Sequence, residues 1–106
     1  MDGQDRGAPP WPRLELSMEG RETEAVKAEA FVIGSGMHCD YALLGPGIER
    51  EHAVVKRTAA GWVLEDLQTE GGTWVSGERV KTLALTSTHA VRIGPCELSF
   101  RVAEKP

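Results

Sequence analysis

The side chains in this sequence that could do chemistry are three histidines and several acidic residues. His38, His52 and His89 stand in three separate segments, without the short spacing between ligands that is typical of zinc sites. Among the carboxylates that could serve as a general acid or base, none has a nucleophile beside it; they are Asp40, Glu65 and Asp66. We therefore expect no metal, no cofactor and no enzymatic activity.

Two further patterns also fail as reactive sites. The segment Ser35-Gly36-Met37 is similar to a glycine loop that cradles phosphate, but the helix that should follow such a loop is missing. Cys39 and Cys96 are interpreted as small buried hydrophobic residues, with a single disulfide between them as the alternative.

Two polar turn segments, residues 47–52 and residues 69–77, are better candidates for a functional site. They flank a pair of strand-like runs, at a spacing that would bring both turns to one end of a sheet. A small β-sandwich builds a binding rim from such loops. The chemistry indicated by these segments is binding rather than catalysis.

The rest of the sequence supplies short strands to carry these turns. Apolar Leu14, Leu16 and Met18 alternate with polar residues, which is the period-2 pattern of a half-buried strand. Residues 25–30 have helix propensity, but we favour an extended conformation that leads directly into the apolar residues 31–33. Turn signals recur about every 8–12 residues and no long amphipathic helix is visible, so the sequence predicts an all-β sandwich.

Length and charge limit the class of protein. The 106 residues suggest one domain, predicted at residues 13–103, after a disordered leader at residues 1–12 and before a short tail at residues 104–106. The net charge of −4 argues against a nucleic-acid or anionic-membrane surface. No apolar run approaches the roughly 20 residues of a membrane helix. We expect a cytoplasmic location, either alone or as the cytoplasmic domain of a larger or membrane-associated protein.

An ordered set of short motifs resembles the forkhead-associated (FHA) domain, a family of β-sandwiches that bind phosphothreonine peptides through loops at one end. The matching motifs run across residues 14–102 and comprise Ile33-Gly34, Cys39-Asp40-Tyr41-Ala42-Leu43, His52-Ala53, Asp66-Leu67, Gly72-Thr73, Val75, Gly77, Leu85, Val91, Ile93-Gly94 and Leu98-Ser99-Phe100. The resemblance implies an FHA-type (SMAD/FHA) sandwich of about eleven strands in two twisted antiparallel sheets.

The departures from the family pattern fall on the residues that the resemblance assigns to ligand binding. Ser35 stands in place of the family arginine that faces the phosphate, and Glu49 in place of the serine whose hydroxyl contacts it. Gly71 replaces the asparagine that bonds to the peptide backbone, and Thr88-His89 replaces a Gly-Asp pair. A phosphothreonine carries about −1.5 to −2 charges, and a carboxylate about 4 Å away costs on the order of several kcal/mol. We expect ordinary phosphothreonine recognition to be lost or severely weakened.

The residues that keep the family pattern are assigned to the shape of the loops. These loop-structuring residues are Gly34, His52, Asp66, Gly72, Thr73 and Gly77, with Asp66 and Thr73 expected to satisfy loop backbone groups. The residues predicted to contact a partner are Ser35, Gly36, Glu49, Arg50, Thr69, Glu70 and Gly71.

The predicted function is that of a non-enzymatic protein-interaction module which binds a partner through its loop rim, independently of phosphothreonine. One alternative keeps phosphothreonine recognition with rearranged ligands such as Arg50 and Lys56. The other is a purely structural or oligomerisation domain of a larger signalling or secretion assembly.

Overall fold

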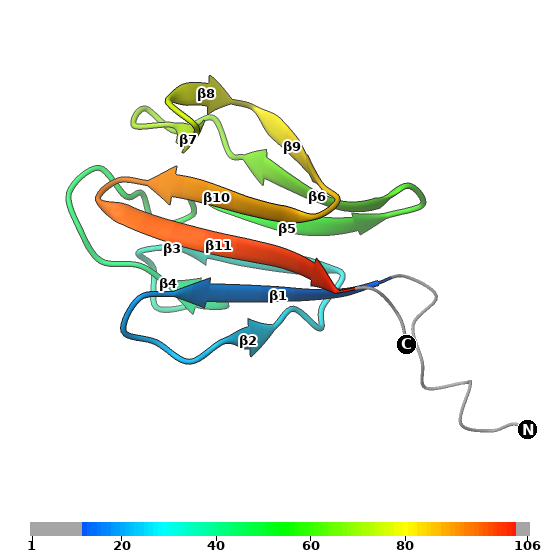
Figure 1. Ribbon diagram of the computed structural model, residues 1–106. Helices are drawn as coiled ribbons and strands as arrows, with labels where there is room; N and C mark the ends of the chain where they lie inside the picture. Colours follow the sequence, from blue (N-terminus) through cyan, green and yellow to red (C-terminus); the bar gives the residue numbers. More distant parts are fainter. Residues whose placement is uncertain (1–11, 104–106) are drawn as a thin grey trace, which may run out of the picture.

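The computed structural model describes residues 12–103 as eleven β-strands (Figure 1), without a helix among them. The strands are β1 (Arg13–Met18), β2 (Glu24–Ala25), β3 (Ala30–Gly34), β4 (Tyr41–Ala42), β5 (Ala53–Thr58), β6 (Gly61–Asp66), β7 (Thr73–Val75), β8 (Glu78–Val80), β9 (Thr82–Leu85), β10 (Thr88–Ile93) and β11 (Cys96–Ala103). The predicted tail and the predicted leader, apart from Pro12, lie outside the described residues. The all-β prediction is confirmed.

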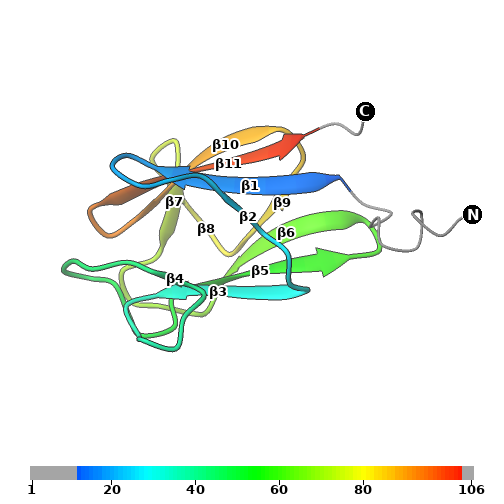
Figure 2. The ribbon, with the colours of Figure 1, turned by 90° about the horizontal axis from the view of Figure 1, so that it is seen from below.

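The strands form two sheets that pack face to face (Figures 1 and 2). One sheet has six strands in the order β2-β1-β11-β10-β7-β8, and the other has five in the order β4-β3-β5-β6-β9. The prediction of antiparallel sheets needs one correction, because β3 and β4 pair in parallel. The loop between them is therefore a crossover rather than a hairpin turn.

The core lies between the two sheets and follows the period-2 pattern of the strands. In the six-stranded sheet Leu14 and Leu16 of β1 face Val102 and Phe100 of β11 in register. All but Val102 are fully buried. Burying a side chain of this size contributes roughly 1.5–3 kcal/mol, so the alternating residues that predicted these strands also hold them together.

Residues 25–30 do not form the single extended run that the sequence predicted. β2 belongs to the six-stranded sheet and β3 to the five-stranded sheet, so the chain changes layers between them. At the crossing Val26 is buried and its N–H donates to the carbonyl of Leu14 at 2.9 Å. The helix alternative was rightly rejected, but no pattern in the sequence marks the change of sheet.

The loops that carry the motifs gather at one end of the sandwich, which we call the rim end. Figure 1 shows that the β3–β4, β4–β5 and β6–β7 loops and the β10–β11 turn share this end. The described chain begins and finishes at the opposite end, where Arg13 pairs with Ala103. In residues 12–103 there is no helix long and apolar enough to cross a membrane.

Candidate functional site

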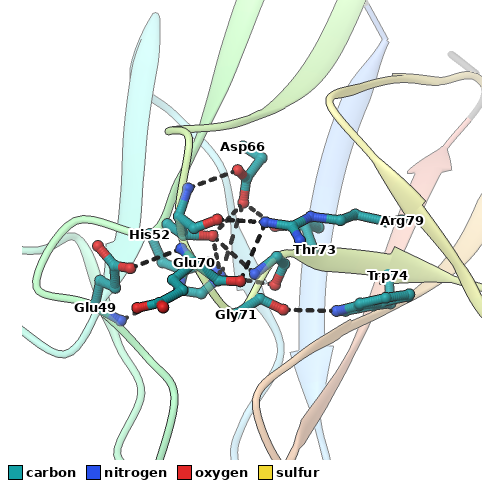
Figure 3. Close-up of polar contacts among 10 residues, drawn as sticks. Glu49, His52, Asp66, Glu70, Gly71, Thr73, Trp74 and Arg79 are labelled. Carbon is teal, nitrogen blue, oxygen red and sulfur yellow. Dashed lines mark hydrogen bonds and ion pairs between the residues drawn. The ribbon is translucent and has the colours of Figure 1, made fainter.

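A fully buried histidine joins the two loops that the sequence singled out. His52, at the end of the β4–β5 loop, accepts the backbone N–H of Glu49 on Nδ1 at 3.2 Å. Its other ring nitrogen must then carry the proton, so Nε2 donates to the carbonyl of Gly72 in the β6–β7 loop at 2.8 Å. Nε2 also lies 3.1 Å from the hydroxyl of Thr69. One imidazole thus bridges both loops (Figure 3).

Asp66, the last residue of β6, organises the β6–β7 loop. Its Oδ2 accepts the N–H of Thr69 at 2.9 Å, and its Oδ1 accepts the hydroxyls of Thr69 and Thr73, each at 2.8 Å. Asp66 therefore satisfies a loop backbone group as expected, whereas Thr73 bonds to this carboxylate and not to the backbone. Burial alone would raise the pKa of Asp66, but the hydrogen bonds from the backbone and hydroxyl of Thr69 and from the hydroxyl of Thr73 hold it below the ordinary value.

The β7–β8 hairpin holds the same loop from the other side. Trp74 and Arg79 face each other in register across the hairpin. The guanidinium of Arg79 donates to the carbonyls of Thr69 and, at 3.2 Å, Glu70, while the indole N–H of Trp74 donates to the carbonyl of Gly71 at 2.8 Å. Figure 3 shows both side chains reaching toward the loop. Sequence reasoning missed this clamp, because its partners are backbone carbonyls that no residue type reveals.

The backbone of the β6–β7 loop is almost completely engaged. Residues 69–72 have their four carbonyls bonded to Arg79, Trp74 and His52. Their N–H groups bond to the carboxylates of Asp66 and Glu49 and to the hydroxyl of Thr69, except for the N–H of Gly71, which bonds to no described residue. The loop is therefore held in one shape before any partner arrives.

Glu49 connects the β4–β5 loop to the β6–β7 loop at the surface. Its Oε2 accepts the backbone N–H of Glu70 at 2.9 Å (Figure 3). Beside this contact, Gly71 lies so near the Gly47 carbonyl that a Cβ atom on Gly71 would be only 2.8 Å from the oxygen. The space that a larger side chain would need at position 71 is thus occupied by backbone.

The β3–β4 loop is bonded to the β4–β5 loop through its first residues. The N–H groups of Ser35 and Gly36 donate to the carbonyls of Glu49 and Arg50 at 2.9 and 3.1 Å, and the Ser35 hydroxyl donates to the carbonyl of Ile48 at 3.2 Å. A Cβ atom on Gly34 would lie 2.2 Å from the Arg50 carbonyl oxygen, so only glycine allows this approach.

The β7–β8 turn is a tight hairpin in which Ser76 and Gly77 lie between the paired residues Val75 and Glu78. Both central residues have positive φ, 52° at Ser76 and 82° at Gly77. This is the type I′ geometry that matches the twist of the flanking strands. Gly77 was predicted to shape the loops; Ser76 also adopts the left-handed conformation.

The structure divides the predicted contact residues into two groups. Glu49, Arg50, Glu70 and Gly71 are exposed, and Ser35 is half-buried. Gly36 and Thr69 are buried, so the structure moves them to the loop-structuring set. Thr69 is only 3% exposed because its hydroxyl lies between His52 and Asp66.

Other kinds of site have little support. Residues 12–103 contain no group of three or more His, Cys, Asp or Glu side chains placed to hold a metal ion. Cys96 is buried and Cys39 half-buried, both as free thiols. The imidazole of His89 accepts the N–H groups of Thr86 and Ser87, which places it on the β9–β10 turn at the end away from the rim.

Comparisons with known proteins give the same fold. The family model described as "Inner membrane component of T3SS, cytoplasmic domain" matches residues 17–104, where T3SS is the type III secretion system. No curated protein matches the chain.

Solved FHA domains are similar in structure across nearly all of the chain. The FHA-1 domain of Rv1747 from Mycobacterium tuberculosis has a TM-score of 0.79 and 24% identity, covering 88% of this chain and 98% of that one. The FHA domain of FhaA has a TM-score of 0.76 and 23% identity, covering 83% and 99%. EmbR from Mycobacterium tuberculosis has a TM-score of 0.80 and 25% identity, covering 90% of this chain but only 26% of EmbR.

Proposed function

This chain belongs to the family described as the inner membrane component of T3SS, cytoplasmic domain, with an FHA-type protein-interaction fold, and from that premise we propose that it binds a protein partner through its loop rim without phosphothreonine. The proposed setting is a type III secretion assembly, on the cytoplasmic side of the inner membrane. The rim residues offered to the partner are Glu49, Arg50, Glu70 and Gly71, together with the edge of Ser35.

The observation that carries this proposal is the contact between Glu49 and Glu70. At the position where the FHA pattern has a phosphate-contacting serine, a carboxylate accepts the N–H of the neighbouring loop at 2.9 Å. An incoming phosphate would meet this negative charge instead of a donor. At an effective dielectric constant of about 20, like charges about 4 Å apart repel by roughly 4 kcal/mol, which is about three powers of ten in affinity.

The two other altered positions support the same conclusion. The Ser35 hydroxyl already donates to the carbonyl of Ile48, so this shorter side chain has no free proton to replace a guanidinium. Gly71 lacks a side chain, and the nearby Gly47 carbonyl fills the space where one would begin. The three departures are therefore built into the loop packing.

The arrangement of the remaining cations weighs against phosphothreonine binding with rearranged ligands. Lys56 lies in β5 and forms an ion pair with Glu65 at 2.7 Å. Arg50 is exposed on the rim and its side chain contacts no described residue, but a single flexible cation does not replace a bidentate site.

Two solved FHA structures have been determined with a bound ligand. The FhaA domain was solved in complex with the intracellular domain of Rv3910, and EmbR with a low-affinity phosphopeptide. For this chain the rim chemistry favours a protein ligand whose binding does not depend on phosphate.

Paired peptide libraries test this function directly. One library carries threonine and the other phosphothreonine at a fixed central position, and both are titrated by fluorescence anisotropy against the full chain. We expect binders in the unphosphorylated library whose affinity is not improved by the phosphate. Arg50→Ala with Glu70→Lys should weaken these binders, whereas Ala60→Lys, on the exposed β5–β6 turn at the opposite end, should not.

Two results would contradict the proposal. One is selective, tight binding of phosphothreonine peptides that is lost in Arg50→Ala. The other is binding that is indifferent to the rim variants. Sedimentation at increasing concentration separates the oligomerisation alternative, because a rim-binding adaptor should remain monomeric without its partner.

A further inference from the structure

The described chain exposes three large apolar side chains, and all three lie on loops of the rim end. Met37 in the β3–β4 loop is 100% exposed, Leu44 in the β4–β5 loop 78%, and Leu67 at the start of the β6–β7 loop 37%. Within residues 12–103 the opposite end exposes none of this class. Single exposed apolar residues are normal on any surface, but their restriction to one end suggests an interface.

The backbone that carries Met37 is held in place on both sides. Gly36 donates to the Arg50 carbonyl at 3.1 Å, and Cys39 donates back to the Gly36 carbonyl at the same distance. His38 Nε2 lies 2.6 Å from the carboxylate of Glu51. Met37 is therefore the exposed tip of a loop that is fixed to its neighbour.

Leu44 and Leu67 are also attached to bonded backbone. The preceding residue, Leu43, is fully buried and donates to the Gly34 carbonyl at 2.8 Å, while Leu67 itself donates to the His52 carbonyl at 2.9 Å. Because these positions are fixed before binding, a partner loses little free energy to ordering the loops.

The same loops carry an excess of negative charge. Residues 35–40, 43–52 and 67–72 contain four carboxylates, Asp40, Glu49, Glu51 and Glu70, against one guanidinium of their own, Arg50. With the guanidinium of Arg79, which bonds to the β6–β7 loop from the hairpin, the carboxylates still outnumber the cations by four to two. The side chain of Glu70 forms no hydrogen bond or ion pair with a described residue. This distribution attracts a cationic surface, and it disfavours a second copy packed rim to rim, since the carboxylates would then face one another.

We propose that the partner of this rim is a protein segment whose apolar side chains pack on Met37, Leu44 and Leu67 and whose lysines or arginines meet the rim carboxylates. The proposal rests on the proposed function and specifies the chemistry of the partner. In this proposal the apolar contacts supply most of the binding free energy, and the charges set the orientation of the partner on the rim, as in other protein interfaces.

A display library of random unphosphorylated peptides, selected against the full chain, tests this inference. The selected peptides should combine Leu, Ile, Phe or Met with Lys or Arg, and their affinity should fall as salt concentration rises. Met37→Ser, Leu44→Ser and Leu67→Ser should each weaken them, with a loss of about tenfold or more for the most deeply packed residue. Glu70→Lys should slow association of the peptides. Two control variants at the opposite end should leave binding unchanged: Ala60→Lys adds the same charge as Glu70→Lys, and Ala59→Ser adds a hydroxyl as the three serine variants do.

The outcomes separate this inference from the function on which it rests. If the peptides depend on Arg50 and Glu70 but not on any of the three apolar residues, the rim function stands and this inference is wrong. Selected peptides that are acidic also contradict the inference. If the peptides bind but no rim variant affects them, both fail. Dimerisation that is abolished by Met37→Ser would identify a second copy as the occupant and would likewise overturn the inference.

Discussion

The carboxylate of Glu49 accepts the backbone N–H of Glu70 at 2.9 Å, which links the loop before β5 to the loop after β6. A donor of the β6–β7 loop is thereby satisfied from within the chain, at the position where the FHA pattern places a phosphate-contacting serine. The same carboxylate repels anions. One side chain thus links the two loops and, in the proposed function, also disfavours a phosphorylated ligand.

Restoring two of the family residues should create phosphothreonine affinity. The double variant Ser35→Arg with Glu49→Ser removes the repelling carboxylate and supplies a guanidinium and a hydroxyl. We expect affinity for phosphothreonine peptides to rise at least about tenfold, since one charged hydrogen bond is worth about 1.5–3 kcal/mol. The measurement is fluorescence anisotropy with a phosphothreonine peptide library.

The same peptides without phosphate are the control, and Glu22→Gln, at an exposed site without contacts to described residues, is the matched loss of a carboxylate. Gly71→Asn is left out of this variant because its Cβ would press on the Gly47 carbonyl. An equal gain for phosphorylated and unphosphorylated peptides would show that the altered positions do not govern phosphate exclusion.

Replacing His52 should destabilise the whole domain. His52→Phe preserves most of the volume but leaves the N–H of Glu49 and the carbonyl of Gly72 without their partners. Because both groups lose a hydrogen bond at a fully buried side chain, the free energy of unfolding should fall by about 2–5 kcal/mol. Urea denaturation measures this, and His38→Phe, at an exposed site, should change it by less than about 1 kcal/mol. Equal effects of the two substitutions would refute the bridging role of His52.

The fold was largely predictable because apolar and polar residues alternate along several strands, as buried and exposed side chains do in the sandwich. Residues 13–18 and β6 illustrate this, since their buried side chains recur at every second position. Residues 25–30 were harder to assign, because the change of sheet after β2 depends on a backbone contact between Val26 and Leu14. Residue types alone do not encode such a contact.

The site was predictable in outline but not in its division of roles. The spacing of the two turn segments predicted that they meet, and His52 joins them. Thr69 was predicted to contact a partner; it is instead buried, with His52 and Asp66 both bonded to its hydroxyl. The clamp by Trp74 and Arg79 acts on carbonyls, and the sequence carries no signal for it.

Two glycines at tight backbone positions, Gly34 and Gly77, should respond differently to alanine. At Gly34 the added Cβ would lie 2.2 Å from the Arg50 carbonyl oxygen, so backbone must move. At Gly77 nothing lies within 4 Å of the added Cβ, and only the φ of 82° is unfavourable. We expect Gly34→Ala to cost about 2–3 kcal/mol of unfolding free energy and Gly77→Ala about 1 kcal/mol, as measured by urea denaturation. Gly77→Asn, which tolerates this conformation better, is the control. A larger loss for Gly77→Ala than for Gly34→Ala would contradict the close approach of the two loops.

The buried hydroxyl of Tyr41 should be dispensable. Tyr41 is 2% exposed, and its hydroxyl oxygen has no hydrogen-bond partner among residues 12–103. Burial raises the pKa of this hydroxyl above the ordinary value of 10.0, although Arg21, 4.8 Å from the ring centre, opposes the shift. Because Tyr41→Phe removes an unpaired polar group, we expect the thermal midpoint to stay constant or rise by a few degrees. A clear fall in the midpoint would show that the hydroxyl makes a contact that stabilises the fold.

The stability of the domain should decrease in acid because of Asp66. Its pKa in the folded chain lies below the ordinary value of 3.8, since Thr69 and Thr73 bond to the ionised form. Above the ordinary value both folded and unfolded chains are ionised at this site, and the full stabilisation is present. As the pH falls, the unfolded chain takes up the proton first, so stability declines from about pH 5 until the folded pKa is passed.

Asp66→Asn should lower the free energy of unfolding at pH 7 by about 1–3 kcal/mol, because an amide cannot accept all three hydrogen bonds. The same substitution should also reduce the loss of unfolding free energy as the pH falls below about 5, which the urea midpoint at each pH measures. Glu22→Gln at an exposed site is the matched control for the loss of a carboxylate. If the wild type and Asp66→Asn lose stability in parallel as the pH falls, the acid sensitivity originates in other carboxylates and the role assigned to Asp66 is wrong.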